Sequence, residues 1–320
     1  MKAIGGYFGL ECDLKENYPF EEYHHINTAR NGIELVLQQI KPTKVFLPYF
    51  TCNVILEPVN KLKIPYEFYD IGFDFEPNIN IDKIGEKDCL ILNNYFGITT
   101  KLVNRFKKHK IKNLIIDNAQ ALFAQPIEEV YNIYSPRKYV GLPDGGLIYS
   151  NIELELPIVP DQSYGRCSHL LKRIDLSAEE AYSDFQFNDK VLENQPTKKM
   201  SNLTQYLLRN IDFETLRKKR IENFNCIAQA LNEENVIKIE QLISENDVPM
   251  IYPYYSEDSE YLRKKLIQNK IYCALYWPNV LNWCDENHNA FQLAKNIIAI
   301  PIDQRYSINE MKKIISCIKS

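Results

Sequence analysis

The sequence lacks the marks of several protein classes. Its eight cysteines are scattered, with no Cys-x-x-Cys pair and no cysteine–histidine cluster at metal-ligand spacing, so we expect no structural metal site. No apolar run is long enough to span a bilayer, and no signal-peptide pattern is present. These absences predict a protein of the reducing cytoplasm without a membrane partner. The chain also has no internal repeat and no low-complexity tract.

An excess of positive charge is missing as well. Lysine and arginine number 38 against 42 acidic residues, which gives a net charge of −4. The short basic clusters at 107–108 and 217–220 lie in helical patterns and are interpreted as solvated faces. Nucleic acid is therefore not expected as a partner.

What is present is the composition of a folded protein with a sizeable core. The chain has 320 residues, of which 45% are hydrophobic and 25% charged. This length favours one large domain with a smaller companion.

Helical and strand patterns alternate through the first half of the chain. After an irregular stretch over 1–27, Thr28 is a good N-cap for a helix whose free N–H groups could bind an anion. The patterns predict strands at 45–47, 66–69, 89–93, 114–116 and 131–134, with helices at 53–62 and 101–109. Because the strands are apolar runs, they predict a mostly parallel sheet covered by helices on both faces, a three-layer α/β/α architecture.

The second half is organised differently. A proline-rich irregular segment at 151–163 precedes a helical stretch at 203–231. Strands are predicted at 250–254, 272–275 and 297–300, and helices at 257–268 and 308–318. We therefore predict a large cofactor-binding domain over 1–205 and a smaller C-terminal α+β domain over 206–320. Trp277 and Trp283 could line a substrate mouth, although core packing is the favoured interpretation.

The most informative stretch runs from Tyr131 to Ser150. Lys138 lies between two predicted strands, after Pro136 and before Gly145-Gly146, which permit positive φ or close backbone approach. Upstream, Asp117 ends a buried strand, where ligands of parallel sheets are found. An anion site, a strand-end carboxylate and a loop lysine together fit pyridoxal 5′-phosphate (PLP), which needs all three.

The order and spacing of these motifs resemble the DegT-type sugar aminotransferases, a branch of the fold-type I, aspartate-aminotransferase-like PLP enzymes. The resemblance runs from Ile4 to Asp303. Its specific pieces are Leu47-Pro-Tyr-Phe-Thr-Cys52, Tyr95-Phe-Gly97, Ile115-Ile-Asp-Asn-Ala-Gln-Ala121, and Ser135-Pro-Arg-Lys138 through Asp144-Gly-Gly146.

The resemblance implies a role for each matching residue. Lys138 matches the Schiff-base lysine, Asp117 the partner of the pyridine nitrogen, and Gln120 a hydrogen-bonding residue near the ring hydroxyl. Ala29 and Arg30 match the start of the phosphate-binding helix, where backbone N–H groups act.

The sequence also departs from the family pattern. Cys52 stands where many members have an aromatic against the cofactor ring, so Tyr95 is our candidate to cover that face. Ile133 replaces a usual serine, so Ser135 is our candidate for the phosphate contact. A common histidine is replaced by Asn94, and the segment that often reaches across the dimer is replaced around 197–200.

By resemblance, the chain is an aminotransferase that forms homodimers. It would transfer an amino group from an amino acid to a keto-sugar nucleotide in polysaccharide or secondary-metabolite biosynthesis. Two alternatives stay open at this point: a PLP enzyme acting on a non-sugar substrate, and a non-catalytic relative that binds cofactor or sugar.

Overall fold

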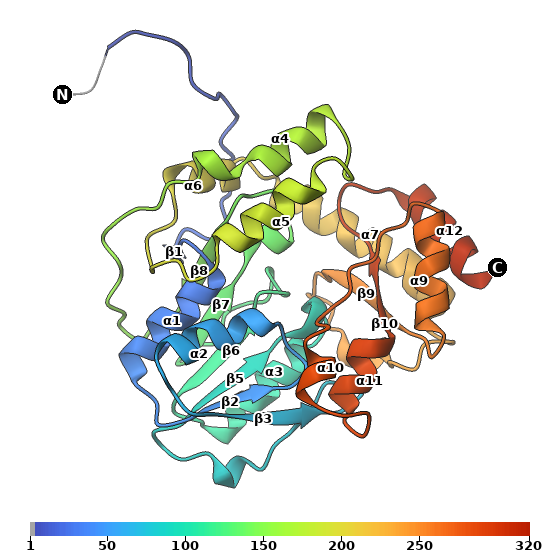
Figure 1. Ribbon diagram of the computed structural model, residues 1–320, viewed down its shortest axis with the longest axis horizontal. Coiled ribbons are helices and arrows are strands. Elements are labelled where there is room, and N and C mark those ends of the chain that lie inside the picture. The colour runs from blue at the N-terminus through green and yellow to red at the C-terminus, as the bar shows by residue number, and fades with distance from the viewer. Residues whose placement is uncertain (1–3) are drawn as a thin grey trace.

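The computed structural model describes residues 4–320, and its largest element is an eight-stranded sheet (Figure 1). In spatial order, its strands are β1 (His24–Ile26), β8 (Gly146–Tyr149), β7 (Tyr131–Tyr134), β6 (Leu114–Asn118), β5 (Cys89–Asn93), β2 (Val45–Pro48), β3 (Tyr66–Ile71) and β4 (Pro77–Asn78). Five of these strands, β7, β6, β5, β2 and β3, are parallel. Strands β8 and β4 run antiparallel to their inner neighbours, and β1 runs antiparallel to β8. The predicted mixed, mostly parallel sheet is confirmed.

Helices cover this sheet and build most of the remaining chain. They are α1 (Ala29–Ile40), α2 (Leu56–Lys61), α3 (Thr100–Phe106), α4 (Ser168–Asp175), α5 (Tyr182–Val191), α6 (Asn202–Leu208), α7 (Phe213–Leu231), α8 (Ile239–Leu242), α9 (Ser259–Gln268), α10 (Val280–Trp283), α11 (Asn289–Asn296) and α12 (Ile308–Lys319). A second sheet pairs β9 (Ile251–Tyr255) with β10 (Ile297–Pro301) in antiparallel register. No helix within residues 4–320 is long and apolar enough to cross a membrane.

The two faces of the large sheet bury different helices. Successive side chains of a strand point to opposite faces. Accordingly, Ile91 and Ile115 pack in a cluster with α1 and α2, whereas their strand neighbours Leu92 and Leu114 pack in another cluster with α3. The three layers predicted from the apolar runs are therefore present.

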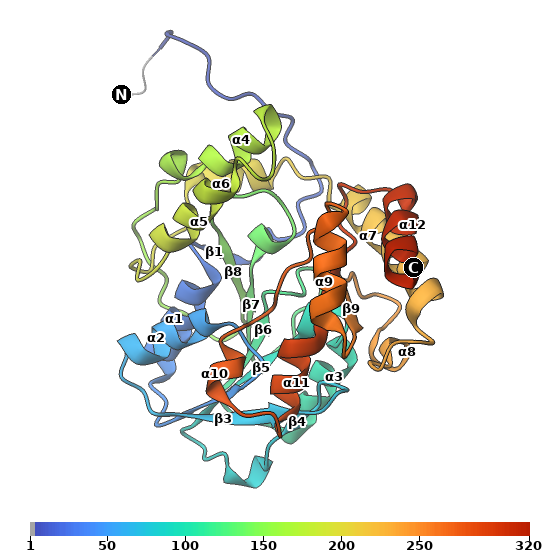
Figure 2. The same ribbon diagram turned by 45° about the vertical axis from the view of Figure 1, so that its right-hand side comes forward.

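The second cluster does not stop at the large sheet. It continues through α7, β9 and β10 to α12, so the C-terminal region shares one hydrophobic core with the large sheet. In both views this region, with α7, α9 and α12, lies beside the sheet (Figures 1 and 2). The predicted division between residues 205 and 206 falls inside α6, and it stays a prediction.

Three predicted elements differ from the structure. The predicted strand at 272–275 is wrong: only Ala274 makes a bridge, to Ala299, and the left-handed backbone of Lys270 and Trp277 ends the extended run on both sides. The helical stretch at 203–231 is two helices, because Asp212 caps α7 by accepting from the Thr215 N–H at 3.0 Å. The stretch expected to be irregular contains β1, which pairs with β8.

A buried arginine joins the C-terminal region to the large sheet. Arg220 of α7 donates to the Met250 carbonyl at 2.9 Å and to the Gln304 Oε1 at 3.0 Å. Its guanidinium also donates to the Tyr139 carbonyl at 3.3 Å and lies over the Tyr139 ring, 4.6 Å from the centroid. Because Tyr139 directly follows Lys138, this contact fixes the backbone beside the predicted cofactor lysine.

We predict that Arg220→Met lowers the free energy of unfolding by about 2–4 kcal/mol, because it removes the hydrogen bonds of the buried guanidinium to the Met250 carbonyl and to Gln304. Urea denaturation measures this change. Arg217→Met, on the exposed face of the same helix, is the matched control and should stay within about 0.5 kcal/mol of the unsubstituted protein. Equal stability of the two variants contradicts the prediction.

Candidate active site

Polar side chains gather where three parallel strands end. Asn93 ends β5, and Asp117 lies beside it in register on β6. Strand β7 ends next to them and leads into the segment that carries Lys138. Since ligands of open α/β sheets bind beyond the carboxyl ends of the strands, this edge is the expected place for a site.

The backbone after β7 forms a short turn, and Lys138 lies at the end of that turn. Pro136 begins a 3₁₀ turn, η5 (Pro136–Lys138), and the Tyr139 N–H donates to the Pro136 carbonyl at 2.8 Å. Proline suits this first position because its missing N–H has no partner there in any case. Lys138 is exposed, while Pro136 and Tyr139 on either side are buried.

These strand ends and the turn enclose a cavity. It is lined by Thr51, Cys52, Asn93, Asn94, Asp117, Ala119, Gln120, Lys138 and Trp277. Three residues that the resemblance selected are thus brought to one cavity: Asp117 and Gln120 from the end of β6, and Lys138 from the turn after β7.

The Asp117 carboxylate is removed from water and is held by a hydrogen bond from the backbone. Its Oδ1 accepts from the Ala119 N–H at 2.9 Å. Removal from water raises the pKa of Asp117, and the nearby Lys138 charge and the Ala119 N–H work in the opposite direction. A carboxylate held this way suits a ligand that brings its own N–H donor.

Two polar atoms in the cavity wall are left without a partner. Asn93 donates to the Thr51 hydroxyl at 2.9 Å, but its Oδ1 accepts from no group within residues 4–320. Gln120 accepts from the Phe96 N–H at 3.3 Å, but its Nε2 likewise has no acceptor in the described chain. Buried polar atoms are normally hydrogen-bonded, so this pair indicates a ligand with both donor and acceptor groups. The ring nitrogen and hydroxyl of PLP fit that requirement.

The other predicted residues do not line this cavity. Tyr95 is buried in an aromatic cluster, and its hydroxyl donates to the Phe50 carbonyl at 2.9 Å, so the ring of Tyr95 is committed to the core. Ser135 is buried at the end of β7. Ala29 and Arg30 begin α1 at the same sheet edge, where Arg30 forms an ion pair with Glu57 at 2.5 Å.

The glycines of the Asp-Gly-Gly segment have the two roles predicted for them. Gly145 has φ +116°, a conformation that side chains rarely adopt. A Cβ on Gly146 would lie 2.4 Å from the Thr28 backbone carbon, so only glycine lets this strand reach the start of α1. The segment thereby brings the helix start next to the loop that carries Lys138.

Asp144 anchors the same segment in a buried ionic network. Its carboxylate accepts from Arg166 at 2.6 Å, and Arg166 donates to Asp161 at 2.6 Å as well. Lys198 binds the other oxygen of Asp161 at 3.1 Å. Two acids and two bases balance in charge, as buried ions require.

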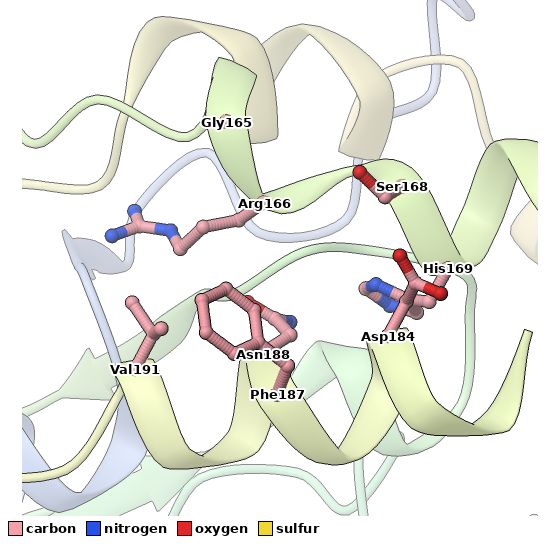
Figure 3. A pocket seen from close by; sticks show the side chains of 8 residues that line it. All are labelled: Gly165, Arg166, Ser168, His169, Asp184, Phe187, Asn188 and Val191. Atoms are coloured by element: carbon pink, nitrogen blue, oxygen red, sulfur yellow. The ribbon is translucent and has the colours of Figure 1, made fainter.

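A second cavity lies beyond this network, between α4, α5 and the turn η6 (Tyr164–Arg166). It is lined by Gly165, Arg166, Ser168, His169, Asp184, Phe187, Asn188 and Val191 (Figure 3). Its lining shares no residue with the first cavity. Among residues 4–320, no three histidine, cysteine or acidic side chains form a group that could hold a metal ion.

Four wall residues were given no role at the site from the sequence: Asn93, Thr51, Ala119 and Trp277. Asn94 was compared with a family histidine, but its neighbour Asn93 matched no family position. Thr51 lies inside the motif at 47–52, where no role was assigned to it. Trp277 comes from the C-terminal region and was assigned to packing. Only Asn93 had a usable signal, since it ends a predicted strand just as Asp117 does.

The fold matches solved aminotransferase structures. The sugar aminotransferase CalS13 from Micromonospora echinospora superposes with a TM-score of 0.64 at 15% identity, over 93% of this chain and 87% of that one. A DegT DnrJ EryC1 StrS aminotransferase from Brucella abortus gives 0.61 at 15%, over 93% and 85%. Spr1654 from Streptococcus pneumoniae, in its PMP form, gives 0.65 at 15%, over 93% and 86%. The chain has the fold of these aminotransferases. No protein-family model and no curated protein sequence matches it.

The shared fold confirms the architecture that the resemblance predicted, including the smaller C-terminal part. At 15% identity, side-chain roles do not transfer with the fold. They depend on the cavity described above, which brings Lys138, Asp117 and Gln120 together.

The ionic network around Asp161 predicts how the free energy of unfolding changes with pH. Burial tends to raise the pKa of Asp161, but hydrogen bonds from Arg166 and Lys198 outweigh it and hold the pKa below its usual value. The folded state therefore binds this proton less readily than the unfolded state, so the contribution to stability is present above about pH 4 and is lost as the pH falls further. Asp161→Asn should weaken the acid dependence of the free energy of unfolding there, measured by urea denaturation at several pH values.

The same substitution leaves the network with excess positive charge, so Asp161→Asn should also be less stable at pH 7. Asp175→Asn, at the exposed end of α4, is the control for loss of an acidic residue. An unchanged acid slope for Asp161→Asn contradicts the prediction.

Proposed function

We propose that the protein is a PLP-dependent aminotransferase that moves an amino group from an amino acid to a keto-sugar nucleotide. One observation carries the proposal: the Lys138 amine and the Asp117 carboxylate line a single cavity that also holds two unpartnered polar atoms. A lysine, a strand-end acid and free hydrogen-bonding groups form the donor set that PLP requires.

Bound PLP supplies an aldehyde that carries the amino group and a ring that withdraws electrons. In this chain, Asp117 would accept a hydrogen bond from the ring nitrogen and would favour its protonated form. Gln120 Nε2, which lacks an acceptor among residues 4–320, would donate to the ring hydroxyl oxygen. Lys138 would hold the cofactor aldehyde, and its amine, when free, would take up and return the proton that moves during transfer.

The phosphate group is assigned to the start of α1. Ala29 and Arg30 lie at the same sheet edge as the cavity, and a helix start favours phosphate through its N–H groups and dipole. The Arg30 guanidinium is already paired with Glu57, so the backbone of this turn makes the contact. Ser135, beside Lys138, adds a hydroxyl.

A sugar acceptor is supported by the fold match to CalS13, which is a sugar aminotransferase. The reaction then belongs to polysaccharide or secondary-metabolite biosynthesis in the cytoplasm. Titrating the pyridoxamine-loaded protein against a panel of nucleotide keto-sugars identifies the acceptor, because the right one restores the absorption of the aldehyde form. If only simple keto acids restore it, the acceptor is not a sugar.

We predict that Lys138→Ala lowers the turnover number by at least about 10²–10⁴-fold, because the residue that shuttles the proton is gone. It should also abolish the adduct that borohydride traps in the unsubstituted protein, located on Lys138 by peptide mass spectrometry. Lys108→Ala, on an exposed turn, is the control and should keep both. Retained turnover in Lys138→Ala rules out the assignment.

The protein is further proposed to act as a homodimer. Helices α4 and α5 lie side by side in both views (Figures 1 and 2). Both helices carry large exposed apolar side chains. The exposed residues are Leu171, Ile174, Tyr182, Phe185 and Phe187. Apolar patches of this kind on a folded surface mark association sites, and a two-fold dimer buries one such patch against its copy.

We predict that Ile174→Glu, at a side chain that is 81% exposed, converts the dimer to monomer in analytical ultracentrifugation. A charge in an apolar interface loses its hydration without gaining a partner. Ile267→Glu, an exposed isoleucine on α9, is the matched control and should leave the sedimentation unchanged. A monomeric unsubstituted protein, or dimeric Ile174→Glu, contradicts the proposal.

A further inference from the structure

Trp277 is the aromatic wall of the cavity. Of the lining residues within the described chain, it alone is aromatic, and the others nearest the strand ends are small or polar. It belongs to the C-terminal region, whereas Lys138 and Asp117 belong to the large sheet. The C-terminal region therefore supplies the aromatic residue of the cavity wall, although Trp277 itself is only 6% exposed.

The Trp277 indole is held in place on several sides. It stacks on Phe96 with ring centroids 6.2 Å apart and planes at 12°, and it forms a T-shaped pair with Phe50 with ring centroids 4.7 Å apart. Two residues later, the Asn279 Nδ2 donates to the Thr51 carbonyl at 3.0 Å and fastens the segment to the cavity wall. Such a surface loses little conformational freedom when a ligand stacks on it.

The backbone at this position is strained. Trp277 has φ +63°, and its stacking partner Phe96 has φ +53°. Bulky residues seldom adopt this left-handed conformation, which costs of the order of 1–3 kcal/mol where it occurs and is concentrated at functional sites. One of the two, Trp277, lines the cavity, and the other, Phe96, packs against its indole.

We propose that the pyridine ring of the bound cofactor lies against the Trp277 indole. The inference rests on the proposed function, since it needs PLP in this cavity. It assigns to the C-terminal region a ring-stacking role that Tyr95, committed to the core, does not fill.

The test is a titration of the cofactor-free full-length protein with PLP, followed by the absorption of the bound form. Trp277→Ala should weaken binding by about twofold to tenfold, the range that aromatic pairing provides. Trp277→Phe should recover most of the loss, because a flat ring is restored, and Trp277→Leu should not. Trp283→Phe is the control, because Trp283 packs against Phe68 and does not line the cavity.

A second readout separates stacking from structural support. Trp277 and Trp283 are the only two tryptophans, so Trp283→Phe leaves Trp277 as the single indole. In that protein, PLP should change the near-ultraviolet circular dichroism of the indole and shield it from acrylamide. This measurement needs no substitution at Trp277, so it decides the question even where Trp277→Ala does not fold.

The outcomes are distinguishable. If PLP is trapped on Lys138 but the Trp277 dichroism and shielding do not change, the stacking role is overturned and the proposed function stands. If Trp277→Ala and the unsubstituted protein bind PLP with equal affinity, the stacking role is also overturned and the proposed function stands. If no PLP is trapped on Lys138 in the unsubstituted protein, the proposed function fails, and the stacking role fails with it.

Discussion

The structure depends on one buried cation, the guanidinium of Arg220. It lies over the Tyr139 ring and donates to the backbone carbonyls of Met250, just before β9, and of Tyr139, just after Lys138. The Tyr139 hydroxyl in turn donates to the Gln120 carbonyl at 2.7 Å. A single side chain of the C-terminal region thus supports both the lysine turn and the cavity wall. Because a guanidinium keeps its charge and five donors in a fixed plane, no other side chain can bridge these groups in the same way.

Much of the large sheet could be predicted from the sequence. Strands such as 89–93 and 131–134 are apolar runs bounded by turn residues, and local pattern is enough to place them. The cap at Thr28 and the glycines at 145–146 could also be predicted from the sequence, because each meets a local steric or hydrogen-bonding requirement. Asp117 and Lys138 were found because strand ends and turns are where such side chains meet.

The rest of the site could not be predicted, because it depends on contacts between distant segments. Trp277 reaches the cavity only through a left-handed backbone residue, and nothing local in Tyr272–Trp277 favours that conformation over a strand. Tyr95 was selected to cover the ring by its place in a motif, but packing among Phe50 and Phe75 draws it into the core. The short strand β1 exists only because β8 offers it an edge. Tertiary packing overrides local preference in all three places.

The continuous hydrophobic core has a consequence for how the chain unfolds. A protein whose two sheets share one apolar cluster cannot lose the smaller sheet without exposing the larger one to water. The free energy of that exposure couples the stability of the two regions. A truncated chain that lacks the C-terminal region loses Trp277 from the cavity wall and also loses part of the hydrophobic core beneath the large sheet.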